Sequence, residues 1–446
     1  MRSLFLVLAL ALAGCGNVSH VSRAPAVSYS TAFNEARPLA AGHAGLSGSA
    51  RRDNAAAIDR LLAQLDDAAL ARDAARLPAG DPLYNFAGRA LLRRGLPLPH
   101  AFDRGDVSFG SANRPPADSD GYRPPLRVGI LLPLAGSQAA AAASVRDGYL
   151  TGYYGEARRR PSLRFYDTST GFGAAYARAS ADGNDLLVGP LTREEVDTAF
   201  SNDASDVPML ALNRGNKPPS AGSAAFSLSP EDEGVSLAQA LIDRGSRAVL
   251  IIAGSEDVQR RTAQSAKLAL ERRGVRIIGN LAYGTQMTDA LNHSDAAPDA
   301  VLLVLKGPQA RTLAPQLASA GLASLPRYAS SQITSGTGKP AEDAALDGII
   351  FPTETWLVRR VPGLPSQASA AAQAKTAKGP AARLFAFGYD AWLLTGHLEQ
   401  LAQNPNASVS GATGRLSLDG FGNVLRRPSW SQFTGGVPVS LSDGAR

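Results

Sequence analysis

The sequence predicts an α/β protein with two doubly wound lobes, preceded by a flexible tether and a short helical hairpin. After residue 125, short apolar runs alternate with helical patterns of about 10 to 17 residues, which is typical of parallel strands buried on both faces. Seven runs between residues 126 and 305 are too many for one small sheet, so we expect two. The runs lie at 126–134, 163–166, 186–188, 209–212, 248–253, 275–278 and 300–305.

The N-terminus has the layout of a secretory signal peptide over residues 1–14. Arg2 supplies the positive charge, and the apolar run at 4–13 is too short to span a bilayer. The letters LAGC at 12–15 resemble the bacterial lipobox, which predicts lipid on Cys15, the only cysteine in the chain. An ordinary signal peptide with an incidental cysteine is the alternative. Gly16 resembles the sorting signal that sends Gram-negative lipoproteins to the outer membrane, facing the periplasm.

Composition limits the remaining possibilities. With 44% apolar and 19% charged residues, the 446-residue chain is long enough for two or three packed domains. One cysteine cannot form an internal disulfide. The formal net charge is +6, but the arginines are scattered and aromatic residues make up only 6% of the chain, so we expect no nucleic-acid partner.

Three segments lead into the lobes. Residues 15–52 are rich in Ser, Ala, Gly and Pro without a sustained period, which predicts a lipidated flexible tether. Helical spacing of apolar residues predicts a short helical segment at 53–104, with one hairpin between 53 and 94. The proline-rich stretch 105–125 is expected to be a linker.

The boundary between the two lobes is expected near 226–230. Glu231, Asp232 and Glu233 follow it and are typical of a helix N-terminus, where carboxylates interact favourably with the helix dipole. A helix that opens the second lobe is therefore predicted at this point.

Several motifs in this order resemble one family. They are RVGILLPL at 127–134, VRDGY at 145–149, LRFYDT at 163–168, LVGPL at 187–191, PMLALN at 208–213, FAFGYDAW at 385–392 and GATGRLSLD at 411–419. Together they resemble a type I periplasmic-binding-protein module. More narrowly, the chain is similar to the LppC-type outer-membrane lipoproteins that activate penicillin-binding proteins. The resemblance covers 126–436.

This resemblance implies three chain crossings between the lobes. Lobe 1 would comprise about 126–229 plus 382–403, and lobe 2 about 230–355 plus 411–436. The stretch 362–380 has little apolar content, and we expect it to be a mobile loop insertion.

A ligand in such a module would lie between the lobes, at the carboxyl ends of the strands. Polar side chains in the corresponding loops of lobe 1 are the candidates for a cleft site: Ser137, Thr168, Ser169, Thr170, Thr192 and Asn213. Helix capping and turn formation are the stronger interpretation, because Ser, Thr and Asn are common at such positions in any protein. We find no convincing counterpart of the carboxylate- and amine-binding set of amino-acid-binding relatives.

Signatures of enzymes and cofactors are weak. Gly171-Phe172-Gly173 lacks the third glycine of a dinucleotide fingerprint, since Tyr176 stands in its place. Gly336-Thr337-Gly338-Lys339 is followed by Pro340 rather than Ser or Thr, so it is expected to be a turn. His20, His43, His100, His293 and His397 show no metal-ligand spacing. We expect no catalytic site, no metal and no cofactor.

The resemblance implies a non-enzymatic regulator that binds and activates a class A penicillin-binding protein in peptidoglycan synthesis. Its partners would be that synthase, outer-membrane lipid through Cys15, and peptidoglycan as a further candidate. The alternative is a solute-binding lipoprotein that delivers amino acids or similar small ligands to an importer. One departure stands out: better-known members of the family carry a long N-terminal domain of repeated helix pairs, whereas the sequence predicts about one pair here.

Overall fold

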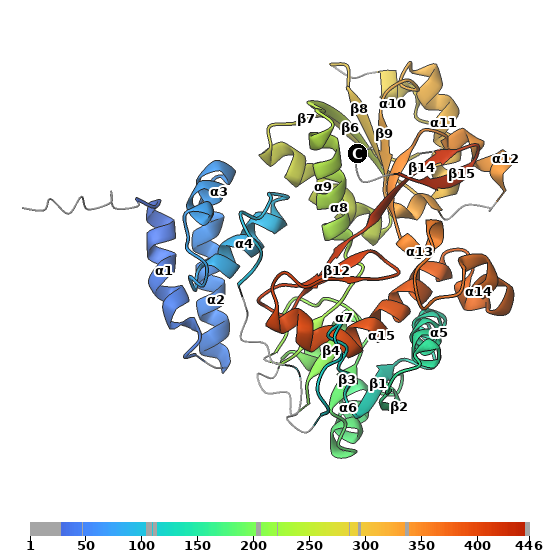
Figure 1. Cartoon of the computed structure of the whole chain (residues 1–446). Helices are drawn as coiled ribbons and strands as arrows, with labels where there is room; N and C mark the ends of the chain where they lie inside the picture. Colours follow the sequence, from blue (N-terminus) through green and yellow to red (C-terminus); the bar gives the residue numbers. More distant parts are fainter. Residues whose placement is uncertain are drawn as a thin grey trace, which may run out of the picture.

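The computed structural model describes residues 28–46, 48–103, 109, 114–201, 207–220, 222–284, 286–292, 296–334 and 339–441. The predicted signal peptide, Cys15, Gly16 and the first part of the predicted tether lie outside these residues, as do His20, His293 and 336–338. In the described part of the chain, no helix has the length and apolar character needed to cross a membrane. Figure 1 shows a group of helices beside two stacked α/β lobes.

Among the described residues before the lobes there are four helices, where one hairpin was expected: α1 (Thr31–His43), α2 (Gly48–Ala63), α3 (Asp67–Ala75) and α4 (Tyr84–Arg93). The prediction of a flexible tether at 15–52 is therefore wrong for the described residues from Thr31 onward, because they form α1 and the start of α2. Residue 47 lies outside the described residues. Pro38 inside α1 and the small residues around it hid the helical pattern. Phe33, Ala36 and Ala40 form the buried face of α1 and pack in one cluster with α2, α3 and α4.

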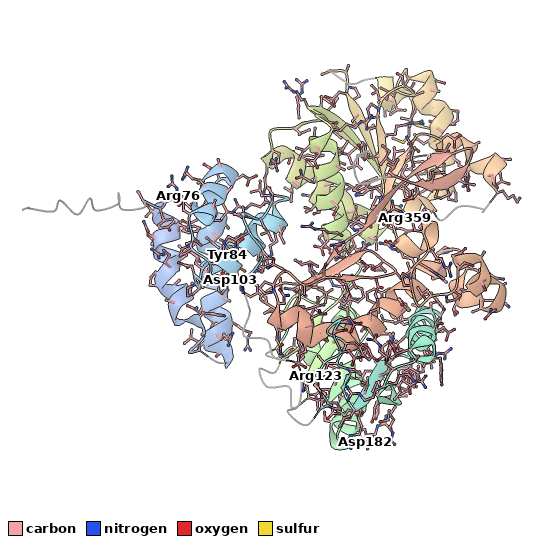
Figure 2. All side chains as sticks on the ribbon, viewed as in Figure 1. Arg76, Tyr84, Asp103, Arg123, Asp182 and Arg359 are labelled. Carbon is pink, nitrogen blue, oxygen red and sulfur yellow. The ribbon has the colours of Figure 1, made fainter. Side chains whose placement is uncertain are left out.

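The described part of the predicted linker packs against lobe 1. Arg114 and Arg123 both bind Glu399, at 2.7 and 2.6 Å. The Arg123 amide also donates to the Gly396 carbonyl at 2.7 Å. Figure 2 labels Arg123 at this position beside lobe 1. Residues 114–125 are thus part of the folded module.

Lobe 1 is built on a five-stranded parallel sheet in the order β2-β1-β3-β4-β5. Its strands are β1 (Arg127–Leu132), β2 (Ser162–Asp167), β3 (Leu186–Val188), β4 (Met209–Ala211) and β5 (Ala224–Ala225). The connecting helices are α5 (Ala139–Gly155), α6 (Phe172–Ala181) and α7 (Arg193–Ala199). The first four strands coincide with predicted apolar runs, which confirms the prediction for this lobe.

Lobe 2 is built on a seven-stranded sheet in the order β15-β14-β10-β9-β8-β6-β7. Its parallel strands are β6 (Ala248–Ala253), β7 (Arg276–Ala282), β8 (Ala300–Val304), β9 (Arg327–Ala329) and β10 (Ile350–Thr353). Two antiparallel strands, β14 (Ser429–Thr434) and β15 (Val437–Ser440), complete it. The five parallel strands lie in the order β7-β6-β8-β9-β10, which repeats the order β2-β1-β3-β4-β5 of lobe 1. The prediction of two doubly wound lobes is therefore confirmed.

Helices cover both faces of the lobe 2 sheet. Apolar residues of α8 (Pro230–Asp243) and α9 (Asp257–Arg272) pack on one face. Those of α10 (Thr288–Asn292) and α11 (Gly307–Ser319) pack on the other. The remaining short elements are η1 (Ser331–Thr334), α12 (Pro340–Asp343) and η2 (Ala344–Leu346). The helix predicted to open lobe 2 is confirmed as α8.

The chain passes between the lobes three times, as the resemblance implied. The first crossing is 226–229, between β5 and α8. The second, 354–380, carries α13 (Thr355–Val358), α14 (Gln367–Gln373) and η3 (Lys375–Ala377). The third, 404–428, carries a small sheet of β11 (Val409–Ser410), β12 (Arg415–Leu418) and β13 (Val424–Arg427).

Two predictions for these crossings are corrected. The stretch 362–380 is not an unpacked insertion, because Leu364, Ala370 and Ala377 are buried against the helix that follows. Residues 411–436 do not all belong to lobe 2. Leu416 and Val424 pack in the core of lobe 1, and only β14 joins the lobe 2 sheet within that range.

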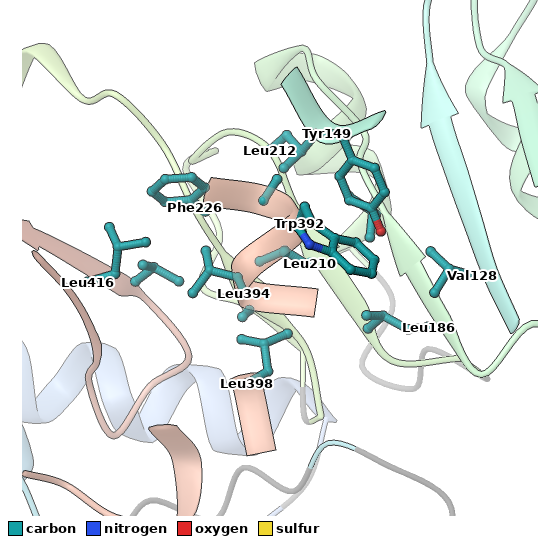
Figure 3. Packing of buried hydrophobic residues seen from close by; sticks show 14 of the residues in the cluster. Val128, Tyr149, Leu186, Leu210, Leu212, Phe226, Trp392, Leu394, Leu398 and Leu416 are labelled. Carbon is teal, nitrogen blue, oxygen red and sulfur yellow. The ribbon is translucent and has the colours of Figure 1, made fainter. Parts of the chain in front are cut away.

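The long helix α15 (Ala381–Gln403) returns to lobe 1 and lies across α5. Glycines make this crossing close: a Cβ on Gly388 would overlap the Val145 carbonyl oxygen, and one on Gly148 would overlap that of Phe385. Beyond the glycines, Trp392 packs edge-on against Tyr149, with ring centroids 5.6 Å apart. Figure 3 shows these rings among the leucines of the lobe 1 core.

Candidate functional site at the junction of the two lobes

The six polar residues predicted for a cleft all lie in lobe 1 loops that follow the carboxyl ends of strands. Their side chains do not converge on one another through any hydrogen bond among the described residues. Ser137 and Thr170 are exposed. Thr192 is the N-cap of α7 and forms a capping box with Glu195. Thr192 therefore serves as a cap, and Ser137 and Thr170 lie in turns.

The other candidates also serve local structure. The Ser169 hydroxyl donates to Asp167 Oδ1 at 2.6 Å. Asn213 Nδ2 donates to the Leu191 carbonyl at 2.9 Å, which ties the loops after β3 and β4 together. Thr168 is buried, and its hydroxyl oxygen has no hydrogen-bond partner in the described structure. Thr168 is thus the buried candidate whose side chain makes no hydrogen bond in the described structure.

The first turn of α8 carries three carboxylates that form ion pairs with arginines from other elements at the junction. Ser229 caps the helix, accepting from the Asp232 amide at 3.3 Å. Proline at the first helical position and three carboxylates behind it favour a helix start here. We call Glu231, Asp232 and Glu233 the acidic turn.

Each residue of the acidic turn binds a different arginine. Glu231 binds Arg261 of α9, within lobe 2, at 2.7 Å. Asp232 binds Arg214, which follows β4 in lobe 1, at 3.1 Å. Glu233 binds Arg383 of α15, also in lobe 1, at 3.3 Å. Two of the three ion pairs therefore join the lobes.

Arg383 is the centre of the buried part of this junction. Its Nε donates to Glu354, directly after β10, at 2.7 Å. Burial alone would lower the pKa of the Arg383 guanidinium, but the carboxylates of Glu354 and Glu233 outweigh it and raise that pKa. Glu233 also accepts hydrogen bonds from the amide and the hydroxyl of Ser331, at 2.5 and 2.9 Å.

Arg426 of β13 adds a fourth charge from the third crossing. Its guanidinium donates to the Thr413 carbonyl at 3.1 Å, and burial lowers its pKa, although Glu354 and Glu233 partly offset this. Glu233, Glu354, Arg383 and Arg426 form what we call the inter-lobe charge cluster. Its two positive and two negative charges balance, so it offers little net charge to a ligand.

Asp390 lies in the middle of α15 and shares a neighbour with this cluster, since Thr413 contacts both Asp390 and Arg426. The carboxylate is fully buried and accepts from the Ala412 amide at 2.5 Å and from the amide and hydroxyl of Thr413 at 2.8 and 2.5 Å. Burial raises the pKa of Asp390 to about 7, against the effect of these hydrogen bonds. Asp390 thus anchors the third crossing to lobe 1.

The side chains that metal ions need as ligands do not cluster within the described ranges. These residues contain no group of three His, Cys, Asp or Glu side chains that could hold a metal ion. The described histidines make local contacts: His43 with Asn54, His100 with Tyr84, and His397 with the Leu393 carbonyl.

One small pocket lies away from the junction, at the amino ends of the lobe 1 strands. Its lining includes Arg114, Arg123, Asp185, Pro208 and Glu399. The two arginines already bind Glu399, so the pocket belongs to the packing of the linker.

Sequence reasoning missed Arg214, Glu354, Arg383 and Arg426. Single arginines in an arginine-rich chain carry no pattern that distinguishes a buried ion pair from a solvated side chain. The acidic turn was recognised as a helix start, but its three arginine partners lie 18, 30 and 150 positions away in the sequence.

Known proteins resemble this chain at the level of sequence. A family model described as "LppC putative lipoprotein" matches residues 122–275 and 271–436. The penicillin-binding protein activator LpoA of Klebsiella pneumoniae is 28% identical over 320 residues, which cover 63% of this chain and 45% of that protein. The chain spans about half the length of the curated relatives it matches.

Solved structures resemble it at the level of fold. The C-domain of LpoA (YraM) from Haemophilus influenzae, described as a regulator of PBP1A, is 25% identical with a TM-score of 0.62, covering 71% of this chain and all of that domain. A "putative branched-chain amino acid ABC transporter" from Chromobacterium violaceum is 26% identical with a TM-score of 0.54, covering 69% of this chain and 100% of that one. The predicted periplasmic-binding-protein type I architecture is thereby confirmed.

Proposed function

Because the chain belongs to the LppC lipoprotein family, we propose that it is a non-enzymatic regulator that binds and activates a class A penicillin-binding protein in peptidoglycan synthesis. The observation that carries the proposal is the match of the whole two-lobed module to the C-domain of a protein described as a regulator of PBP1A. The family model supports it independently, because its match spans both lobes and all three crossings.

The proposed location is the periplasmic side of the outer membrane, with the lipid on Cys15. The support is the signal-like N-terminus, the LAGC motif and Gly16, together with membership of a lipoprotein family. A lipid anchor would hold the module at a high local concentration near the cell wall, where peptidoglycan is a second surface within reach.

Activation through contact requires that the regulator bind the active state of the synthase more tightly than the inactive state. A preorganised surface suits this role, because little conformational entropy is lost when it binds. Within each lobe, helices packed on a sheet supply such a surface.

Solute binding for an importer is the alternative, and the likeness to the Chromobacterium violaceum protein favours it. The junction argues against it. Arg214, in the loop after β4, already binds Asp232 of lobe 2. Five of the six predicted cleft residues are exposed or engaged in local structure.

A pair of measurements separates the two functions. The full-length chain in mild detergent, immobilised through a C-terminal tag, is expected to bind the cognate class A synthase saturably. The same preparation is expected to show no shift in melting temperature with a panel of amino acids and wall fragments. Absence of synthase binding, together with a clear shift by any amino acid, would refute the proposal in favour of solute transport.

A further inference from the structure

We propose that the amino edge of the lobe 2 sheet is a docking surface for an anionic phospholipid membrane, which the protein contacts in addition to its lipid anchor. The surface contains four exposed arginines, which we call the basic edge: Arg244, Arg247, Arg272 and Arg276. The inference rests on the proposed anchor for the location of the membrane. It goes beyond the proposed function because it concerns a second contact, separate from the synthase.

The backbone brings these four arginines to one end of lobe 2. Arg247 directly precedes β6 and Arg276 begins β7, and the Arg276 amide donates to the Arg247 carbonyl at 2.9 Å. Arg272 is the last residue of α9, and Arg244 directly follows α8, the helix that α9 packs against. In a parallel α/β lobe the helices end where the next strands begin, so both helix ends lie at the amino edge.

The basic edge is not neutralised by the chain itself. No carboxylate of the described residues forms an ion pair with any of the four arginines. Asp299 accepts from backbone amides at the start of β6, and Asp243 accepts from a glutamine of its own helix. Glu271 pairs with Lys267 at 3.7 Å. With Lys267 and Arg273 included, six cations lie at this end of the lobe with three carboxylates, so its net charge is positive.

Helix capping explains only part of the cluster. Arg244 and Arg272 lie at helix C-termini, where a positive side chain interacts favourably with the helix dipole. Arg247 and Arg276 lie at the starts of strands instead, and within the described structure their side chains form no hydrogen bond. The helix dipole therefore accounts for two of the four arginines and leaves the other two without a structural use.

An exposed leucine beside the arginines favours a membrane over a soluble anion. Leu268 is 42% exposed and lies one turn before Arg272 on α9, so the two side chains share a face of the helix. A soluble phosphate gains nothing from this leucine, whereas a lipid surface buries its apolar atoms. Lipid phosphates suit the arginines, because a guanidinium group donates two parallel hydrogen bonds to one phosphate.

The part of the chain that leads to the anchor packs beside the basic edge. Arg273 donates to the Gly95 carbonyl, after α4, at 3.5 Å, and α4 packs in one cluster with α1. Figure 1 shows these helices beside α9. The longest of them has 16 residues, or about 24 Å. Ser28 lies thirteen residues after Cys15, and a chain of that length reaches at most about 45 Å. The tether is therefore long enough to let the basic edge meet the membrane that holds Cys15.

Energy transfer to labelled lipids measures whether the basic edge lies at the membrane. The full-length protein is reconstituted into vesicles with acceptor-labelled lipid, made of phosphatidylcholine alone or with about 30% phosphatidylglycerol. A donor dye is attached to A297C, an exposed position two residues before Asp299, or to A177C in α6 as the reference in lobe 1. Cys15 is the only native cysteine, and the proposed lipid blocks it, so each dye reports one position.

With phosphatidylglycerol, transfer from A297C is expected to exceed transfer from A177C. It should fall to the phosphatidylcholine level at about 1 M salt, where the screening length is only about 3 Å. R247Q/R276Q should lower the ratio of docked to undocked protein at least tenfold, because each arginine at an anionic surface contributes about fivefold. Equal transfer from A297C in both kinds of vesicle would overturn the proposal. The salt dependence of the parent requires no variant, so it decides the matter even if R247Q/R276Q does not fold.

R178Q/R360Q is the matched control for charge. Arg178 in α6 and Arg360 after α13 are exposed and form no ion pair in the described part of the chain. The control removes the same charge away from the basic edge and should keep the preference for phosphatidylglycerol. If it loses that preference as R247Q/R276Q does, the attraction is an effect of net charge alone, and the docking surface is refuted.

Three further measurements separate the possible ligands. Inorganic phosphate at constant ionic strength should leave docking unchanged, and displacement by phosphate would overturn the proposal in favour of a small-anion site. Loss of synthase binding in R247Q/R276Q, without any preference for phosphatidylglycerol, would assign the basic edge to the synthase and overturn the membrane contact. Retention by vesicles of pure phosphatidylcholine tests the anchor separately, because acyl chains insert without anionic lipid.

Discussion

Asp390 is the residue whose chemistry most clearly depends on the fold. Its carboxylate lies fully buried and accepts three hydrogen bonds from Ala412 and Thr413. The hydrogen bonds favour the charged form, yet burial outweighs them and raises the pKa to about 7. The motif that contains Asp390 was recognised in the sequence. Its role as the anchor of the third crossing was not, because that role depends on residues 22 and 23 positions away.

The raised pKa makes stability depend on pH. Between the unfolded value of 3.8 and about 7, the folded protein holds a proton that the unfolded chain releases. The stabilisation from Asp390 is therefore complete below pH 3.8 and is lost as the pH rises through 7. Its size is at most on the order of 4 kcal/mol. Denaturant melts of the parent and D390N from pH 4 to pH 8 should show a steeper decline in the parent; parallel profiles would contradict this.

At the scale of elements, the sequence predicted the strands whose apolar runs are long and uninterrupted, such as β1, β6 and β8. It missed β5, which has two residues, and β10, whose Pro352 is unusual inside a sheet. It also missed α1, because Pro38 and the alanines around it resemble a tether. These elements are specified by tertiary packing rather than by local pattern, so periodicity could not reveal them. The sequence correctly placed the six polar candidates in loops that follow the lobe 1 strands. It did not identify the arginines that form ion pairs at the junction.

The crossing of α5 and α15 gives a second prediction. G388A should destabilise the protein by about 2 kcal/mol or more, since its Cβ would overlap the Val145 carbonyl oxygen and the helices must separate. Gly173 in α6 is the matched control, because a Cβ at that position would meet nothing within 4 Å and the backbone there is helical. G173A should stabilise the protein by about 0.5–1 kcal/mol. Urea unfolding checks both; equal effects would contradict the close helix crossing.

At the scale of the whole molecule, the helical domain, formed by α1 to α4 and the segment that follows α4, contacts both lobes. Phe421, in the turn between β12 and β13, packs on Phe86 and lies under the Arg89 guanidinium, 3.7 Å from its ring centroid. On the other side, Arg273 of lobe 2 donates to the Gly95 carbonyl at 3.5 Å. Residues of both lobes therefore contact the helices that precede them.

The contact at Phe421 can be tested separately. F421A removes the ring from between Phe86 and Arg89, so α4 should exchange its amides faster and the free energy of unfolding should fall by about 1–3 kcal/mol. Y154A is the control, because Tyr154 is 72% exposed and its loss should change stability by less than about 0.5 kcal/mol. Unchanged exchange in α4 of F421A would mean that the helical domain is held by other contacts.

The proposed activation of a class A penicillin-binding protein can be measured as the rate of glycan-strand polymerisation by the cognate synthase, with and without the full-length protein in the same detergent. We expect this rate to rise with added protein to a plateau, with no polymerisation by the protein alone. A rate that stays constant at concentrations where the two proteins are shown to bind would contradict it.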